Sequence, residues 1–264
     1  MRGKSFSGAV SGCGSRTRGK EGNKGGKIVT EQVFRTDVYA RTCDATVIAV
    51  DERGIELDRT VFYPMGGGQP GDVGVLRLSD GREVSIQDTR RDRETGAHLH
   101  VPAEGAGLPI AGDAVFAEID WPRRYRLMRM HTAMHLLCSL IPQGVTGGAV
   151  GAEKSRLDFN LPSQTLDKAW LEEKLNRLVK EDHAVSERWI TDEELAAQPE
   201  LVRTMSVKPP MGAGRVRLVR VEGVDLQPCG GTHVCTTSEI GRVRIAKIEN
   251  KGKHNRRVNL VLEE

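Results

Sequence analysis

The run Trp121-Pro-Arg-Arg-Tyr-Arg-Leu-Met-Arg-Met-His131-Thr-Ala-Met-His135-Leu-Leu-Cys-Ser-Leu140 has the pattern of one long helix. Apolar residues recur at spacings of three and four, no breaker interrupts the run after Pro122, and a proline suits a first helical turn. We therefore predict a helix over 123–140. Residues four apart on a helix differ by about 400° of rotation and ~6 Å of rise, so His131 and His135 can turn toward one ion.

A second stretch, Pro228-Cys-Gly-Gly-Thr-His-Val234, places a cysteine and a histidine four residues apart in a glycine-bearing loop. Such a loop can curl so that both side chains converge. Together with the two helical histidines it completes a Cys-His₃ set, which is a tetrahedral donor set that zinc prefers. We predict that one Zn²⁺ ion is held by His131, His135, Cys229 and His233.

Other cysteines and histidines are weaker candidates. Cys138 lies ~10 Å from His131 along the helix axis, which is too far to share the ion, so we expect it in the core. Cys235 remains an alternative to Cys229 if the loop folds differently. For the remaining histidines we expect surface or capping roles; they are His98, His100, His183 and His254.

The motifs exclude two familiar zinc arrangements. No Glu follows the first histidine of the helix, so the general base of the common metalloprotease motif is missing. The Cys-x₃-His spacing differs from the Cys-x₂-Cys of a short zinc finger. A zinc here would lower the pKa of a bound water to ~7, hold a substrate in place, or be purely structural.

Composition bounds the class of protein. With 264 residues, 38% apolar and 28% charged, the chain can bury a sizeable core in one or two domains. It has no run of about 18 apolar residues that would span a membrane. Its five cysteines are odd in number and irregularly spaced, which favours the reducing cytosol. We expect a soluble cytoplasmic protein with no membrane association and no obligate protein partner.

The formal net charge of +3 is unevenly distributed. Residues 1–27 carry seven Lys or Arg against Glu21, a net charge of +6, which leaves −3 for residues 28–264. Because residues 1–29 contain almost nothing apolar, we expect a disordered basic leader. It is either a solvated segment without a role or a basic arm that helps to hold RNA.

Short β-like runs follow the leader over 30–120, and turn signals separate them. Their spacing of roughly 8 to 12 residues predicts a small antiparallel barrel or sandwich. The predicted strands are 45–50, 54–57, 73–78, 83–88 and 114–119. Beyond the histidine helix we predict strands 155–161 and 215–221, a helix over 166–183, a short helix capped at 191–194, and a hairpin of 241–248 and 256–262.

Two further features have open interpretations. Residues 60–72 contain Gly66-Gly67-Gly68-Gln69, which matches neither a Walker A loop nor a dinucleotide fingerprint. The three glycines permit either a tight strand connection or a close backbone approach to a ligand. The carboxyl-terminal hairpin collects positive charge, as a charged sheet edge or as a contact for a phosphate backbone. Its basic residues are Arg242, Arg244, Lys247, Lys251, Lys253, Arg256 and Arg257.

Taken together, these motifs resemble those of a known family. The two histidines of the helix and the Pro-Cys-Gly-Gly-Thr-His-Val loop resemble the zinc signature of the editing domains of alanyl- and threonyl-tRNA synthetases. The run Val61-Phe-Tyr-Pro-Met-Gly-Gly-Gly-Gln-Pro-Gly-Asp72 resembles the glycine-rich motif of the free-standing alanyl-tRNA editing proteins, the AlaX family. The similarity extends from about Asp44 to the carboxyl end.

The resemblance implies an α+β fold: an N-terminal small antiparallel β-barrel (30–120) followed by a two-layer α/β editing domain (121–264). It implies a cytoplasmic trans-editing deacylase, with Zn²⁺ as cofactor, that hydrolyses the ester of tRNA for alanine mischarged with serine or glycine. The four zinc ligands would be the catalytic centre, and Gly66, Gly67, Gly68 and Gln69 would shape the substrate pocket. Contacts to the acceptor stem would come from Arg242, Arg244, Lys251, Lys253, Arg256 and Arg257.

Two departures from the family pattern affect the substrate pocket. Met65 stands where an acidic residue often precedes the glycines, and Ala149 lies where some relatives use a polar side chain. Thr132 or Thr146 could read the amino acid instead. The general base stays open among Glu153, Asp158, a zinc-bound water and the terminal hydroxyl of the tRNA. Two alternative functions are editing of seryl-tRNA for threonine and RNA binding by a structural-zinc module without turnover.

Overall fold

A closed antiparallel β-barrel forms the amino-terminal half of the protein. The computed structural model describes residues 29–162, 165–205 and 214–263, so the predicted leader lies outside the described residues apart from Val29. The barrel strands neighbour one another in the order β2-β3-β7-β6-β5-β8. Their bounds are β2 Thr42–Asp51, β3 Gly54–Leu57, β5 Gly74–Leu78, β6 Glu83–Arg91, β7 His98–Pro102 and β8 Ala114–Ile119.

Buried and exposed residues alternate along the barrel strands, so that one face of each strand fills the interior of the barrel. In β8, Val115, Ala117 and Ile119 are buried while Ala114 and Phe116 face solvent. Closure pairs every barrel strand on both sides, which leaves no sheet edge exposed. The five strands predicted from the sequence correspond to β2, β3, β5, β6 and β8.

Two short strands, β1 (Glu31–Gln32) and β4 (Arg59–Thr60), pair in parallel, and the 3-10 helix η1 (Val33–Arg35) follows β1.

The sixth barrel strand, β7, contains His98 and His100, for which surface or capping roles were predicted. That prediction is wrong, because the two residues are 3% and 0% exposed. The ring nitrogens of His100 lie 2.7 Å from the Thr60 hydroxyl and 2.9 Å from the Ile55 carbonyl oxygen. A polar ring can be buried when it is hydrogen-bonded in this way.

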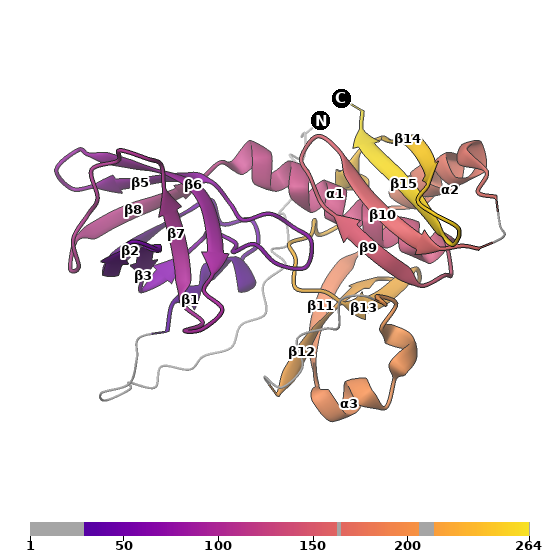
Figure 1. The fold of residues 1–264 in the computed structure, drawn as a ribbon, viewed down its shortest axis with the longest axis horizontal. Coiled ribbons are helices and arrows are strands. Elements are labelled where there is room, and N and C mark those ends of the chain that lie inside the picture. The colour runs from indigo at the N-terminus through magenta and orange to yellow at the C-terminus, as the bar shows by residue number, and fades with distance from the viewer. Residues whose placement is uncertain (1–28, 163–164, 206–213, 264) are drawn as a thin grey trace, which may run out of the picture.

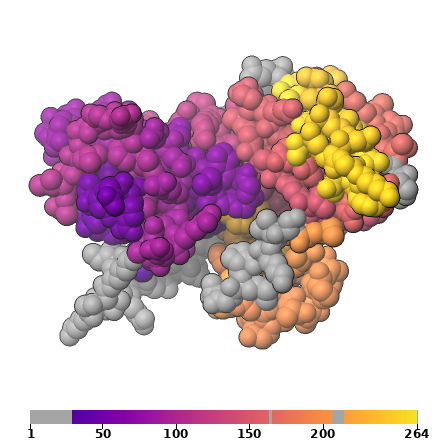
Figure 2. Space-filling model, viewed as in Figure 1, coloured from indigo at the N-terminus to yellow at the C-terminus, as the bar shows by residue number. Residues whose placement is uncertain are grey.

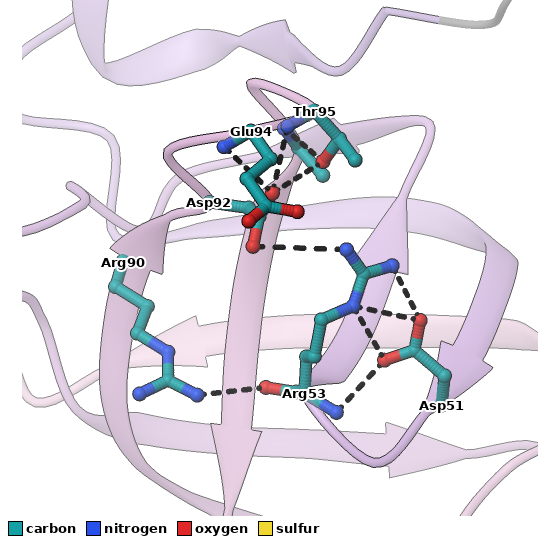
Figure 3. Close-up of polar contacts among 7 residues, drawn as sticks. Asp51, Arg53, Arg90, Asp92, Glu94 and Thr95 are labelled. Atoms are coloured by element: carbon teal, nitrogen blue, oxygen red, sulfur yellow. Dashed lines mark hydrogen bonds and ion pairs between the residues drawn. The ribbon is translucent and has the colours of Figure 1, made fainter.

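Ion pairs link two hairpin turns at one end of the barrel (Figure 3). Arg53, in the turn after β2, pairs with Asp51 at 2.6 Å and with Asp92, beyond β6, at 3.6 Å. Arg90 donates a hydrogen bond to the carbonyl oxygen of Arg53. These groups are largely solvent-exposed, so the network adds little free energy of folding.

Helix α1 (Trp121–Leu140) leaves the barrel and enters a mixed α/β region (Figure 1). Asp120 caps it by accepting a hydrogen bond from the Arg123 amide, and Pro122 occupies the first turn as predicted. Trp121 packs against the hydrophobic cores of both halves. Among the described residues, no helix is long and apolar enough to cross a membrane.

Two sheets flank α1. One sheet has the order β14-β15-β10-β9 and the other the order β11-β12-β13, which lies below α1 in Figure 1. The strands are β9 Val145–Ala149, β10 Ser155–Asn160, β11 Val185–Thr191, β12 Arg215–Val221, β13 Asp225–Pro228, β14 Val243–Asn250 and β15 Asn255–Leu262. The remaining helices are α2 Lys168–Lys180, α3 Asp192–Ala196, and the 3-10 helices η2 Pro199–Leu201 and η3 Thr237–Ile240. The α+β class predicted for the chain is confirmed.

The predicted elements of this half are present. Helix α2 is shorter than 166–183 because the Asp167 side chain caps its start, and Asp182 turns the backbone to φ 55° just past its end. The capping box predicted at Thr191 forms with Glu194. Sequence patterns missed β9, β11 and β13, of which β9 contains two glycines and β13 has only four residues.

The glycine-rich motif is a tight turn next to α1. The amides and carbonyls of Gly66 and Gln69 bond reciprocally, and Gly67 and Gly68 have φ of 57° and 82°. Two successive residues at positive φ make a type of turn that glycine forms at the least steric cost. The motif thus turns sharply and presents the side chain of Gln69 to the second half of the protein.

Candidate metal centre

The four predicted ligands converge. His131 and His135 lie one turn apart on α1, and Cys229 and His233 lie in the loop that follows β13. Their ligand atoms all lie within 4.8 Å of one another, and the three histidines are buried. Cys138 is buried in the core, as predicted, and Cys235 is not part of the group.

Two separations between ligand atoms match those around a tetrahedral ion. Sγ of Cys229 lies 3.5 Å from Nε2 of His131 and 3.3 Å from Nε2 of His233. Zinc bonds of about 2.3 Å to sulfur and 2.0 Å to nitrogen, at tetrahedral angles, separate these atoms by about 3.5 Å. A Cys-His₃ donor set and this geometry therefore fit a resident zinc ion.

The glycine-rich motif orients the first histidine. Nδ1 of His131 donates a hydrogen bond to the side-chain oxygen of Gln69, at 2.9 Å. That oxygen also accepts from the amide of Thr232 at 3.0 Å, and the Gln69 side-chain amide donates to the Thr232 hydroxyl at 2.8 Å. Gln69 is fully buried, so its side chain contacts the ligand His131 and the loop of Thr232 but not solvent.

The other two histidines are anchored through the same nitrogen. Nδ1 of His135 donates to the carboxylate of Asp225 at 2.9 Å. The Thr132 hydroxyl donates to the Met128 carbonyl at 2.9 Å, which leaves its oxygen to accept from Nδ1 of His233 at 3.2 Å. All three Nδ1 atoms are thus held, and all three Nε2 atoms are available to an ion, as in many protein metal sites.

The electrostatics of the pocket favour a cation. Burial opposes ionisation of the Cys229 thiol, but the charges of His131 and His233 lower its pKa well below the usual value. Burial lowers the pKa of His135, but the hydrogen bonds and negative charges of Asp225 and Cys229 together outweigh burial and raise that pKa to about 9. The pocket therefore holds the negative charge of a thiolate beside that of Asp225.

Two arginines hold the loop that carries Cys229. Arg217 of β12 donates to the carbonyl oxygens of Cys229 and Gly231, both at 2.9 Å. Arg35, at the end of η1, donates to the carbonyl oxygen of Gly230 at 2.7 Å. Three consecutive carbonyls of the loop thus face arginine side chains from two distant parts of the chain.

A buried ion pair joins the glycine-rich motif to the histidine helix. Arg124 of α1 pairs with Asp72 through two nitrogens and also donates to the Val61 carbonyl oxygen at 2.9 Å. The side chains of Arg124 and Asp72 are 0% and 2% exposed. This pair fixes the motif on the helix that carries His131 and His135.

The remaining predicted substrate residues lie in varied surroundings. Gly67 and Gly68 are exposed, and Gly68 packs against the backbone of Gly148 in β9. Thr132 is fully buried behind His233. The Thr146 hydroxyl lies 3.1 Å from both the Asp158 carbonyl and the Asn255 side-chain oxygen, within the sheet.

The basic residues of the hairpin divide into two groups. Arg242 and Arg244 lie near the start of β14 and pair with Glu263 at 2.9 and 3.5 Å. Lys251 and Lys253 are exposed in the turn at the other end, roughly 20 Å away along the strand. Arg257 pairs with Asp158 at 2.7 Å. Figure 2 shows the hairpin, in yellow, open to solvent on this face.

Sequence reasoning missed several residues that support the site. Asp225 had a usable signal, because an acidic residue four positions before Cys229 is a natural partner for a ligand histidine. Arg35 and Arg217 had none, because only the fold brings them to the loop.

The fold and the site define a class of protein: a β-barrel joined to an α+β region with a Cys-His₃ group that could hold a metal ion. Comparison with known proteins specifies the class. The family described as "Threonyl and Alanyl tRNA synthetase second additional domain" matches residues 216–259, and "tRNA synthetases class II (A)" matches residues 29–123.

Individual relatives are similar over most of the chain. The alanyl-tRNA editing protein AlaX-M of Methanosarcina acetivorans is 39% identical over 89% of this chain and 99% of its own length. AlaX-M of Saccharolobus solfataricus is 34% identical over 87% and 98%. An alanine–tRNA ligase of Sulfurisphaera tokodaii is 35% identical over 83% of this chain but only 25% of the ligase. The chain belongs to the alanyl-tRNA editing protein family, AlaX, which confirms the resemblance of the motifs.

Proposed function

We propose that the protein is a zinc-dependent trans-editing hydrolase, which cleaves the ester between serine or glycine and a tRNA for alanine. The observation that carries the proposal is the ligand set, in which three anchored histidines and one thiolate converge on a point that fits zinc. Membership in the editing family supplies the substrate class. Such a hydrolase would act in the cytoplasm, where tRNA is charged.

In the proposed reaction, water adds to the ester carbonyl, the bond to the ribose oxygen breaks, and that oxygen takes a proton. A zinc ion held by His131, His135, Cys229 and His233 would supply a Lewis acid for the carbonyl and lower the pKa of water. The protein contributes preorganisation: Gln69, Thr132 and Asp225 hold the three rings before the substrate arrives.

We propose positioning roles for two residues that the family resemblance suggested as substrate contacts. Gln69 and Thr132 are both fully buried and bonded to ligand histidines, which favours a role in metal binding. Gly67 and Gly68 are exposed next to β9, so they and Gly66 are better placed to form a wall of the substrate pocket. The hydroxyl of Thr146 already donates within the sheet, so it would contact substrate as a hydrogen-bond acceptor.

The acceptor stem would contact the basic hairpin. Lys251 and Lys253 offer exposed charges, and the guanidinium groups of Arg242 and Arg244 are largely exposed beside Glu263. Arg256 and Arg257 follow the turn. Phosphate contacts of this kind give sequence-independent affinity that falls with salt.

The two carboxylates considered as the general base, Asp158 and Glu153, are poorly suited to that role. The hydrogen bond from Arg257 and the charge of Arg156 lower the pKa of Asp158, which makes it a weak base. Glu153 is 88% exposed. We therefore favour a metal-bound water, or the terminal hydroxyl of the tRNA, as the general base of the reaction.

The proposal is tested with tRNA for alanine charged with serine. Purified wild-type protein should release serine, and chelation or His131→Ala should abolish release. Normal release by metal-free protein would contradict a catalytic metal. Running glycyl-tRNA for alanine and seryl-tRNA for threonine in parallel decides between the candidate substrates.

A structural-zinc RNA-binding module is the alternative of a different class, because the four ligands could close the coordination shell. The two are separated by circular dichroism after chelation. A structural ion contributes folding free energy, so its removal would unfold the region around α1, whereas a catalytic ion would leave a folded and inactive protein.

A further inference from the structure

An exposed tryptophan lies on the sheet that holds the metal loop. Trp189 of β11 is 52% exposed, which is unusual for a large aromatic side chain. It pairs directly with Arg217 of β12 in the antiparallel register. Directly paired residues place their side chains on the same face, with Cβ atoms about 5 Å apart. Trp189 therefore lies beside the arginine that holds the carbonyls of Cys229 and Gly231.

An arginine that pairs with no acidic side chain among the described residues lies at the same loop. Arg35 donates to the Gly230 carbonyl, and its guanidinium lies 5.0 Å from the centre of the Phe34 ring. Burial and the charge of Arg217 lower the pKa of Arg35 to about 10, so it stays positive at neutral pH at an energetic cost. Glu187 is near both arginines, but it pairs with Arg217. An anion placed at Arg35 would relieve this cost.

We propose that Trp189 and Arg35 form a site for the 3′-terminal nucleotide of the tRNA, beside the metal centre. The indole ring would stack on the terminal base, and the guanidinium would bind the phosphate on its 5′ side. Aromatic stacking with a base and an arginine for the phosphate are the usual means of holding single-stranded nucleic acid. The inference rests on the proposed function, because an ester on the terminal ribose must reach the metal while base and phosphate lie beside it.

Two separate surfaces of the protein would then bind two parts of the tRNA. The hairpin of β14 and β15 would bind the acceptor stem, whereas Trp189 and Arg35 would fix the last nucleotide. Such anchoring acts through binding, so its loss should appear mainly in KM. It also explains why a large ring stays uncovered on a strand next to the buried metal centre.

The test uses zinc-loaded, full-length protein and mischarged tRNA. Trp189→Ala should raise KM about tenfold, the size expected for loss of one stacked base. Trp189→Phe, which keeps a ring, should restore most of the affinity. The matched control is Trp170→Ala, because Trp170 is similarly exposed, at 46%, but lies on α2.

Arg35 is tested through salt dependence. Arg35→Gln should raise KM and reduce the slope of log KM against log salt by about 0.7, the value for one phosphate of a single strand. The control is Arg188→Gln, on the same strand as Trp189 but at the neighbouring, opposite-facing position. Zinc content and melting temperature are measured for each variant, because loss of either would indicate a purely structural role and overturn the inference.

A second readout separates this inference from the proposed function. The trinucleotide CCA, the 3′ end of tRNA, should quench the tryptophan fluorescence of the wild type and of Trp170→Ala but not of Trp189→Ala. Quenching without any deacylation would retain the site and reject the hydrolase. Deacylation with equal KM for Trp189→Ala and Trp170→Ala would reject the site. So would a change in oligomeric state of Trp189→Ala without a change in KM, which would indicate a protein partner.

Discussion

The side-chain oxygen of Gln69 lies 2.9 Å from Nδ1 of His131, and this hydrogen bond joins a turn at the barrel to the metal centre. The same oxygen accepts from the amide of Thr232, one residue before the ligand His233. One carboxamide thus orients a ligand of the helix and the loop that supplies the other two ligands. The glycine-rich motif reaches the candidate metal centre through the side chain of Gln69.

Replacement of this carboxamide should weaken metal binding. In Gln69→Leu, Nδ1 of His131 loses its acceptor and the ring loses its fixed orientation, so zinc affinity should fall about 10- to 100-fold. Competition with a chromogenic chelator measures the affinity. Gln87→Leu is the control, because Gln87 is exposed on β6. Equal zinc affinity of the two variants would show that Gln69 has no positioning role.

The sequence predicted the ligand set because helical periodicity is a local property. A spacing of four on α1 places His131 and His135 on one side, whatever the rest of the chain does. The loop motif likewise fixes Cys229 and His233 within five residues. Four strong donors in two short segments therefore identified the centre before any contact between those segments was known.

The support of the site depends on contacts that no local pattern encodes. Gln69 reaches His131 across 62 residues, and Arg35 reaches Gly230 across 195. Strand β7 escaped prediction for a related reason: the ring of His100 is buried with hydrogen-bond partners, Thr60 and Ile55, that come from outside its own strand. Hydrogen-bond partners decide whether a polar residue is inside, and these partners are set by the tertiary structure.

The pair of Arg124 and Asp72 should be essential for stability. Arg124→Met leaves the buried carboxylate of Asp72 without its charged partner, so the free energy of unfolding should fall by about 3–5 kcal/mol. Urea denaturation followed by circular dichroism measures the change. The double variant Arg124→Met/Asp72→Asn should be more stable than the single one, since it removes the unpaired charge.

The control for this pair is Arg82→Met. Arg82 pairs with Asp80 at 2.6 Å in an exposed turn, where loss of an ion pair changes the free energy of unfolding very little. Similar losses in Arg124→Met and Arg82→Met would refute a special role for the buried pair. A double variant less stable than the single one would show that packing, and not charge, dominates at this position.

Stability should depend on the protonation of His100. Burial lowers the pKa of His100 from 6.5 to about 4, so between these values the unfolded chain binds a proton that the folded barrel excludes. The contribution of His100 to the free energy of unfolding should therefore be fully present above pH 6.5. It should be lost as the pH falls toward 4. The shift corresponds to about 3 kcal/mol, at 1.36 kcal/mol per pKa unit.

The contribution of His100 is isolated by comparing slopes, because other groups also titrate in this range. The stability of His100→Asn should change less between pH 7 and pH 4.5 than that of the wild type, when both are measured without metal. The exposed His254 provides the control, since His254→Asn should keep the wild-type slope. Parallel curves for His100→Asn and the wild type would contradict the burial of a neutral ring.

Adjacent glycines of the metal loop should respond differently to the same substitution. A Cβ at Gly231 would lie 2.1 Å from Cε1 of His131 and 2.3 Å from Nδ1, so Gly231→Ala must displace the ligand ring from its bond with Gln69. A Cβ at Gly230 would have no neighbour within 4 Å. Zinc affinity should therefore fall at least tenfold in Gly231→Ala and stay unchanged in Gly230→Ala, as measured by chelator competition. Equal affinities would mean that the loop moves freely, and the hydrogen bonds of Arg217 to its carbonyls would then not hold it in place.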